Sequence, residues 1–597
     1  MKKIAFAVAT LVSMSVFAQK AVHIYKKDGT KVEYQVADLD SIVFVKADTE
    51  PVNPVNPTDP VEQGEGTTSG EVVTKGDVAI SRSAGWFESG YVEWTPVSGA
   101  TGYNVYYKSA NAGSYTKVDA MLVRNYGSYF RADVVGLPAG SYEIKVVAVK
   151  GNSELGAASV AQIKTKAYSR QGFAFAQSSV TGGNGIGAYN DNGSLKSGAV
   201  VLYITEKTKK TVTMDVVTST KGTTTTCTGI SAILKAMQKG LENRPVCIRI
   251  IGKVTIDGIN ESGDTNNLLL KASNESSPIQ NITIEGIGND ATCYGWGIRG
   301  LRTRSIEVRN LGLMLWGDDG LAFETANYNI WIHHNDIFYG AEGSDADQVK
   351  GDGSMDLKND SKYMTISYNH FFDSGKMSLC GMKSETGPNY ISYDHNWFDH
   401  SDSRHPRIRT MSVHVWNNYY DGVSKYGVGV TYGASAFVEA NYFRNCNKPM
   451  LSSKQGTDAL GEGSFSGEDG GIIKSYNNVF AEKSSKFSYI TYQTNKTSFD
   501  AYEASSRNEQ VPGSIKTVAG GTPYDNFDTN NSLMYVYTAD DPANVPAIVT
   551  ANAGRIDGGD FKWKFNNSTD DASYSINTQL KNAINGYTSK LVSVLGE

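Results

Sequence analysis

The chain has 597 residues, with 61 glycines, 34 tyrosines and 15 prolines. Because domains usually contain roughly 100–200 residues, we expect at least two, and the many short Val/Ile/Thr/Tyr runs favour β structure over helical bundles. The formal net charge is −6 with scattered Lys and Arg, which excludes the concentrated basic surface of a nucleic-acid-binding protein.

The first 18 residues have the pattern of a secretory signal peptide. Two lysines precede an apolar run from Ile4, and small residues stand before Gln19. The run is shorter than the about 20 apolar residues that span a bilayer, so we expect cleavage and no transmembrane anchor. The mature chain is predicted to be secreted by the Sec route and to be extracellular or periplasmic.

Two short segments follow the signal peptide. Residues 19–46 alternate apolar and polar side chains around Asp28-Gly29-Thr30, which predicts a β-hairpin. Residues 47–76 are rich in Pro, Gly and acidic residues with few large apolar ones, which predicts an extended linker.

Residues 77–167 contain several short strand-like runs at regular spacing, which predicts a small β-sandwich. The placement of Trp94, Tyr103 and Tyr106 resembles that in fibronectin type III domains. Alternating tyrosines more often serve cross-strand packing than ligand binding, so we interpret this domain as a spacer.

Residues 168–597 carry a repeat that predicts a parallel β-helix. An asparagine recurs every 22 to 37 residues after a strand-like run, at Asn310, Asn335, Asn369, Asn396, Asn418, Asn441 and Asn478. Each run holds four to six β-prone residues, which fits one turn of a β solenoid better than a helical repeat. We expect the asparagines to stack as a hydrogen-bonded ladder, where their tolerance of left-handed backbone is useful.

An acidic insertion separates Asn335 from Asn369. It contains Glu342, Asp345, Asp347, Asp352 and Asp356. Carboxylate oxygens are the ligands that Ca²⁺ prefers, although acidic loops are often only solvated. Asp318 and Asp319 are predicted to lie about one coil before Asp352.

Cationic residues follow the insertion directly. They are Lys376, Arg404, Arg407 and Arg409, and we expect Arg404 one coil from Asp356. Arginine binds carboxylates through two parallel hydrogen bonds, so a polyuronate with one carboxylate per sugar is a fitting ligand. A network of surface ion pairs is the alternative interpretation.

Six phrases between residues 290 and 480 resemble the pectate lyases of polysaccharide lyase family 1. They are WIHHNDIF (331–338), DGSMDLK (352–358), MTISYNHF (364–371), DHNWF (394–398), SRHPRIR (403–409) and VHVWNNYY (413–420). The resemblance implies an all-β, right-handed parallel β-helix, which agrees with the fold that the repeat predicts.

The resemblance also implies roles for individual residues. Arg404 matches the arginine that acts as Brønsted base, and Lys376 and Arg409 match residues that bind the substrate. Asp352 and Asp356 match a pair of calcium ligands.

One departure from the family concerns the preceding coil. Gly320 aligns where the family usually has an aspartate. Asp318 matches a further calcium ligand of some members. Two alternatives follow: Asp318 or Asp319 takes the place of the missing aspartate, or Asp352, Asp356 and substrate carboxylates hold the metal with weaker affinity.

The implied activity is calcium-assisted β-elimination on polygalacturonate by a monomeric pectate lyase, giving 4,5-unsaturated galacturonides. An arginine base implies an alkaline pH optimum. A calcium-independent pectin lyase acting on methylated pectin is one alternative, although Asp352 and Asp356 argue against it. The other is a non-catalytic β-helix that binds polysaccharide or acts as an adhesin.

Overall fold

The computed structural model describes the strands Ala21–Tyr25 and Lys31–Gln35 and residues 72–176, 184–259, 264, 266–343, 349–460 and 465–597. The chain forms two units, Met1–Pro60 and Val61–Glu597. In the first unit, β1 (Ala21–Tyr25) pairs antiparallel with β2 (Lys31–Gln35), as the hairpin prediction requires. The predicted signal peptide and residues 47–71 of the predicted linker lie outside the described residues.

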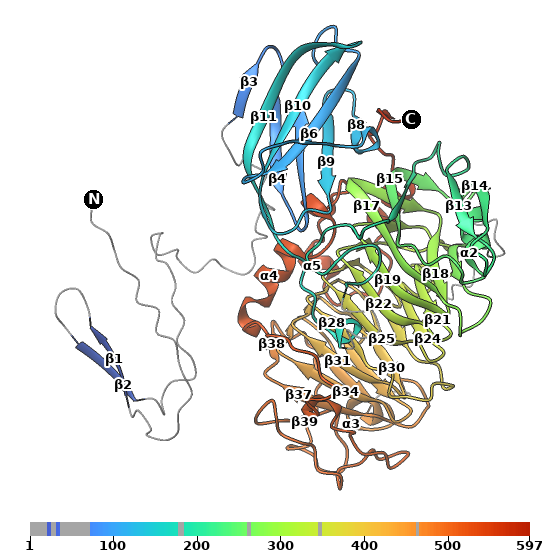
Figure 1. Cartoon of the computed structure of the whole chain (residues 1–597). Helices are drawn as coiled ribbons and strands as arrows, with labels where there is room; N and C mark the ends of the chain where they lie inside the picture. Colours follow the sequence, from blue (N-terminus) through green and yellow to red (C-terminus); the bar gives the residue numbers. More distant parts are fainter. Residues whose placement is uncertain are drawn as a thin grey trace, which may run out of the picture. The chain divides into compact units, whose positions relative to one another are not determined.

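The second unit begins with a β-sandwich of two five-stranded antiparallel sheets (Figure 1). One sheet has the order β3 (Val72–Lys75), β11 (Ser153–Thr165), β10 (Gly140–Lys150), β6 (Gly102–Ser109) and β7 (Thr116–Lys117). The other has the order β4 (Ile80–Gly85), β5 (Ser89–Trp94), β9 (Phe130–Val135), β8 (Val123–Asn125) and β40 (Ser593–Val594). Val92, Trp94, Val105 and Ile144 are fully buried between the sheets.

Two edge strands of the sandwich differ from the predicted boundaries. β3 lies inside the segment predicted as linker, and β40 belongs to the segment predicted as β-helix. Both predictions are wrong for these residues. A short edge strand is held by hydrogen bonds to the unpaired backbone groups of its neighbour. It therefore needs no alternating pattern of apolar and polar side chains by which the sequence could reveal it.

The β-helix is built from an eight-stranded and an eighteen-stranded sheet, and successive coils pair in parallel (Figure 1). The eight-stranded sheet contains β16 (Asn267–Lys271), β18 (Gly297–Leu301), β21 (Leu321–Glu324), β24 (Met355–Lys358), β27 (Ser378–Cys380), β30 (Arg407–Arg409), β33 (Val428–Thr431) and β36 (Met450–Ser452). The eighteen-stranded sheet contains β12 (Val200–Ile204), β15 (Val246–Thr255), β17 (Ile279–Tyr294), β19 (Thr303–Arg309), β20 (Gly312–Met314), β22 (Tyr328–His333), β23 (Asp336–Ile337), β25 (Lys362–Ser367), β26 (His370–Phe372), β28 (Ile391–Asp394), β29 (Trp397–Asp399), β31 (Ser412–Trp416), β32 (Tyr419–Asp421), β34 (Ser435–Glu439), β35 (Tyr442–Arg444), β37 (Ile472–Tyr476), β38 (Val479–Ala481) and β39 (Tyr502–Glu503). The predicted parallel β-helix is confirmed.

Stacked apolar side chains form the core of the β-helix. One column of fully buried residues runs through seven coils: Ile306, Ile330, Met364, Ile391, Val413, Ala436 and Ile473. Each coil buries its inward face only because its neighbours cover it, so stability is shared along the stack.

Short elements surround the coils. The hairpin of β13 (Thr213–Val217) and β14 (Thr224–Thr228) packs with α2 (Ile230–Met237), which also contacts β16 near the first coils. α3 (Gly456–Leu460) follows β36, and the C-terminal part contains α4 (Val545–Asn552), α5 (Asn567–Asp570) and α6 (Thr578–Asn585). Among the described residues, no helix combines the length and apolar character needed to cross a bilayer.

An asparagine ladder connects the coils. Each side-chain amide donates to the carbonyl oxygen of the next asparagine at 2.9–3.0 Å, through Asn335, Asn369, Asn396, Asn418, Asn441 and Asn478. The left-handed residue is the one before each of these, such as His334 with φ 52°. Asn310 itself has the left-handed conformation (φ 55°). The next residue, Leu311, stands where the other coils have the ladder asparagine, and its backbone N–H donates to Asn335. The prediction that Asn310 belongs to the ladder was therefore wrong.

We expect Asn396→Ala to lower the free energy of unfolding by about 2–4 kcal/mol, because it leaves buried donors and acceptors of two neighbouring coils unpaired. Asn396 is fully buried and binds Asn369, Asn418 and the carbonyl of Ile366. Urea unfolding measures the change. Asn478→Ala is the control, since this end of the ladder is partly exposed and should lose only about 1 kcal/mol. Equal losses would contradict the ladder argument.

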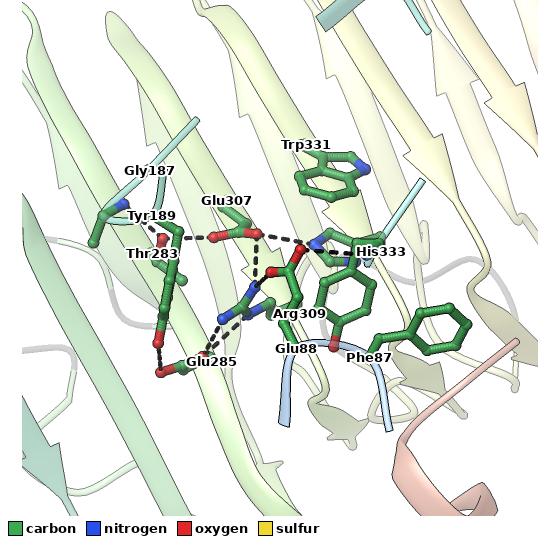
Figure 2. Close-up of polar contacts among 12 residues, drawn as sticks. Phe87, Glu88, Gly187, Tyr189, Thr283, Glu285, Glu307, Arg309, Trp331 and His333 are labelled. Atoms are coloured by element: carbon green, nitrogen blue, oxygen red, sulfur yellow. Dashed lines mark hydrogen bonds and ion pairs between the residues drawn. The ribbon is translucent and has the colours of Figure 1, made fainter. Parts of the chain in front are cut away.

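The sandwich is fixed to the β-helix by buried ion pairs. Figure 2 shows Arg309 of β19 between Glu285 and Glu307, with Glu88 of the sandwich beside it. The Arg309 nitrogens lie 2.8 Å from Glu285, 3.1 Å from Glu307 and 3.5 Å from Glu88. Ile251 and Ile287 of the β-helix also join the apolar core of the sandwich. The sandwich and the β-helix are therefore joined within the second unit.

Candidate functional site

The predicted site residues lie on the outer face of the eight-stranded sheet and in the turns that lead into its strands. β24 explains the arrangement: Met355 and Leu357 are fully buried in the core, so Asp356 and Lys358 point outward. Successive strand residues face opposite sides of a sheet. We call this surface, formed by β21, β24, β27 and β30 with their preceding turns, the candidate face.

Four carboxylates gather at one end of the candidate face. Oxygens of Asp318, Asp319 and Asp352 lie within 4.8 Å of one another. The Lys358 ammonium lies 3.1 Å from Asp319 and 2.9 Å from Asp356, so it connects the carboxylates of two adjacent coils. The expected proximity of Asp318 and Asp319 to the Asp352 coil is confirmed.

Asp319 is the residue of the preceding coil whose carboxylate lies near that of Asp356. A Cβ atom at Gly353 would lie 2.6 Å from an oxygen of Asp319 and 2.6 Å from an oxygen of Asp356, so a larger residue there would displace these carboxylates. Burial and the charge of Asp356 raise the pKa of Asp319 even though Lys358 opposes the shift. Two carboxylates this close favour a bound cation.

The predicted cations follow in the next two coils. Lys376, in the turn before β27, places its ammonium 3.0 Å from Asp352. Arg404 lies before β30, with φ 66° and a carbonyl that accepts from the Ser378 N–H at 2.8 Å. Arg404 is thus two coils from Asp356, and the expectation of one coil was wrong because the Lys376 coil intervenes.

The Arg404 side chain is partly exposed. Within the described parts of the chain, its guanidinium has no hydrogen-bond or ion-pair partner. Arg409 differs, since its Nε donates to Glu468 at 2.9 Å. Arg404 is therefore a cation on the candidate face whose hydrogen-bonding capacity is open to a ligand.

Glu468 is a site residue that sequence reasoning missed. It accepts from Arg409 and Thr431 and pairs with Lys383 at 2.9 Å. Burial opposes its ionisation, but hydrogen bonds from Arg409 and Lys383 lower the pKa of Glu468 to about 2. Nothing in the sequence connects it with Arg409, 59 residues earlier. Lys358, by contrast, could have been predicted, because it lies two residues after Asp356 on one strand and therefore faces the same side of the sheet.

A second group of acids lies away from the candidate face. Oxygen and nitrogen atoms of Asp399, His400 and Asp421 lie within 4.8 Å of one another. Arg444 lies 2.5 Å from Asp421, and both Arg444 and His400 pair with Asp571. The negative charge is matched by protein cations, so this cluster is a structural ion-pair network.

His400 makes stability depend on pH. Burial opposes its protonation, but the hydrogen bond to Asp399 and the ion pair with Asp571 outweigh burial and raise the pKa of His400 to about 10. Since the unfolded value is about 6.5, the stabilisation is complete below pH 6.5 and is lost as pH rises through 10. We expect His400→Gln to reduce the free energy of unfolding by on the order of 3 kcal/mol at pH 6. Urea unfolding at pH 6, 8 and 10 measures it, and a deficit that stays constant with pH would contradict this assignment.

Comparison with known proteins identifies the family. The family model of the pectate lyases matches residues 163–495, more than half of the chain. The chain belongs to the pectate lyase family. The matched region contains the whole candidate face and the asparagine ladder.

Individual relatives match shorter stretches. A pectate trisaccharide-lyase of Bacillus licheniformis is 30% identical over 237 residues, which is 39% of this chain and 65% of that protein. Pectate lyase A of Emericella nidulans is 33% identical over 184 residues, covering 30% of this chain and 55% of that protein. The chain therefore spans about 65% and 55% of these two relatives.

A solved structure of a pectate lyase from Bacillus sp. N165, in complex with trigalacturonate, is also similar. The sequences are 21% identical, and the match covers 65% of this chain and 99% of that one with a TM-score of 0.43.

Proposed function

We propose that this chain is a calcium-dependent pectate lyase that cleaves polygalacturonate by β-elimination and releases 4,5-unsaturated galacturonides. The observation that carries the proposal is the order of groups across successive coils: the carboxylates, then Lys376, then Arg404 and Arg409. A polyanionic chain lying on this face would meet a proton acceptor between binding cations. The family membership supports the same activity.

Calcium fits the donor set at the carboxylate end. Asp318, Asp319, Asp352 and Asp356 supply only hard oxygen ligands, and Asp319 carries a raised pKa that a bound cation would relieve. Bound there, Ca²⁺ would supply positive charge that draws electrons from the substrate carboxylate and acidifies the C5 proton.

The chain's own residues supply the remaining parts of the reaction. Lys376 holds fixed positive charge beside the carboxylates, which stabilises an enolate-like carboxylate as the proton leaves. Arg409, oriented by Glu468, would bind a neighbouring uronate carboxylate through its remaining N–H groups. Arg404 would take the C5 proton. The C5–H electron pair then forms the C4–C5 double bond, the C4–oxygen bond breaks, and the leaving oxygen takes a proton from water.

A guanidinium normally keeps its proton in proteins, so an arginine base should gain activity as the pH rises. We therefore infer an alkaline optimum. An optimum below neutrality on polygalacturonate would contradict Arg404 as the base.

The test is the ultraviolet absorbance of unsaturated product from polygalacturonate, with calcium and with EDTA. Product only with calcium is expected. Product that persists in EDTA, and faster turnover of methylated pectin, would favour a calcium-independent pectin lyase. Binding of the polymer without any product would favour a non-catalytic binding protein or adhesin.

We further infer that the protein acts as a secreted monomer, outside the cell or in the periplasm, and that the sandwich is of the fibronectin type III kind. The signal-peptide pattern of residues 1–18 supports secretion. The placement of Trp94 in the sandwich core supports the domain type. Cleavage of the signal peptide is tested by N-terminal sequencing of the exported protein, and the monomer by light scattering.

A further inference from the structure

A pocket lies on the C-terminal segment, outside the candidate face. It has a volume of about 770 Å³. Its walls are the extended segment 562–566, the start of α6, and Asp373 and His400 from two turns of the β-helix. α6 buries Leu580 and Ile584 in an apolar cluster with residues of the coils, so the pocket is built on a fixed part of the chain.

Aromatic rings form the floor of this pocket. Phe565 is 7% exposed and stacks on His400, with ring centroids 4.4 Å apart. Trp563 lies beside Phe565, with centroids 6.2 Å apart and ring planes at 75°. The indole Nε1 of Trp563 is buried and has no hydrogen-bond partner among the described residues. Aromatic side chains flanked by polar groups are typical of a site for a polar ring such as a sugar.

The polar wall of the pocket favours an anion. Lys562 and Lys564 alternate with the aromatic residues, and both side chains are exposed. The Lys562 ammonium donates to the Asp557 carbonyl, so Lys564 is the lysine that can meet a ligand. Lys564 has no ion-pair partner within the described part of the chain. The N-terminus of α6 opens onto the pocket, and its first turn contains no acidic residue, so the helix dipole adds positive potential.

Two acids also line the pocket, but the protein already engages both. Asp373 lies 2.6 Å from the Lys350 ammonium and accepts a hydrogen bond from the Tyr339 hydroxyl. The Asp570 carboxylate accepts the Asn566 backbone N–H at 2.8 Å. Both acids are therefore engaged by the protein, whereas Lys564 is left to meet a negatively charged ligand.

The pocket and the candidate face share the same turns. Asp373 precedes Lys376 by three residues, and His400 precedes Arg404 by four. Three or four residues span at most about 10–14 Å even when fully extended. Asp373 and His400 therefore lie within about 14 Å of Lys376 and Arg404, respectively.

We propose that the pocket of Trp563, Lys564 and Phe565 is an accessory subsite for a uronate unit of the same polysaccharide chain that lies on the candidate face. The proposal rests on the proposed function for the identity of the sugar. Its role is to hold long chains, so short oligomers that occupy only the candidate face gain nothing from it.

The test is Lys564→Glu, with Lys496→Glu as the control. Lys496 is also exposed, and among the described residues it has no ion-pair partner. For polygalacturonate we expect Lys564→Glu to raise KM about three- to tenfold, because it replaces an attractive charge with a repulsive one. kcat/KM on trigalacturonate should stay within about twofold, and Lys496→Glu should change neither substrate. Equal effects on polymer and trimer, or no effect of Lys564→Glu, would overturn the subsite.

A binding measurement separates this proposal from the activity. Retention in gels containing polygalacturonate is compared for Arg404→Ala alone and combined with Lys564→Glu, Trp563→Leu or Lys496→Glu. Weaker retention with Lys564→Glu and Trp563→Leu, but not with Lys496→Glu, supports the subsite even if the protein makes no product. Unchanged retention in all combinations overturns it, whatever the activity.

Discussion

Replacing Arg404 with lysine is expected to lower kcat on polygalacturonate by about a hundred- to ten-thousandfold, the usual contribution of a positioned proton acceptor. Lysine keeps the positive charge but not the planar guanidinium or its reach. The fold should be unchanged, because the side chain has no partner within the described residues and the left-handed backbone is held by the hydrogen bond from Ser378. Initial rates of ultraviolet absorbance and the melting temperature measure the two effects.

Arg407→Lys is the matched control for this prediction. Arg407 is the first residue of β30, which begins three residues after Arg404. It is partly exposed and stands near Glu468 and the ring of Phe465. If positive charge on this face were all that mattered, both lysine variants would keep their activity. If any change to an arginine of this face disturbed the sheet, both would lose it. A large loss confined to Arg404 is what a proton acceptor requires.

Much of the candidate face could be predicted because a solenoid converts order along the chain into order in space. Asp352, Lys376 and Arg404 belong to successive coils, so their sequence order is their spatial order. Strand periodicity likewise places Asp356 and Lys358 outward once β24 is recognised. The prediction that Arg404 lies one coil from Asp356 was wrong because the repeat lengths vary from 22 to 37 residues, so a sequence separation does not fix the number of coils.

Contacts between distant segments could not be predicted. β40 pairs with β8 across more than 460 residues, and Glu468 reaches Arg409 from a separate loop. Such contacts depend on how folded elements pack against one another, and the periodic sequence patterns that predict strands do not predict this packing. The junction in Figure 2 is similar, since Glu88 of the sandwich and Arg309 of the β-helix are far apart in the sequence.

Asp319→Asn is expected to change stability in opposite directions with and without calcium. In EDTA the variant should be more stable than the native chain by about 1–2 kcal/mol at pH 8, because an ionised Asp319 is buried beside Asp356. Its pKa is raised on folding, so ionisation costs stability as the pH rises above the usual carboxyl value of about 4. The advantage of the variant should therefore shrink toward pH 4.

In calcium the order should reverse. A cation that binds only the folded state at a hundred times its dissociation constant adds about 2.7 kcal/mol, and loss of one carboxylate ligand removes most of this gain. Melting temperatures in calcium and in EDTA, at pH 5 and pH 8, give all four values. Asp360→Asn is the control, because this exposed-turn aspartate binds Thr386 and lies apart from the carboxylate group. The same sign of effect in both solutions would show that Asp319 is not a calcium ligand. A reversal seen only for Asp319→Asn would make the Asp319–Asp356 pair the element that couples calcium to the fold of the candidate face.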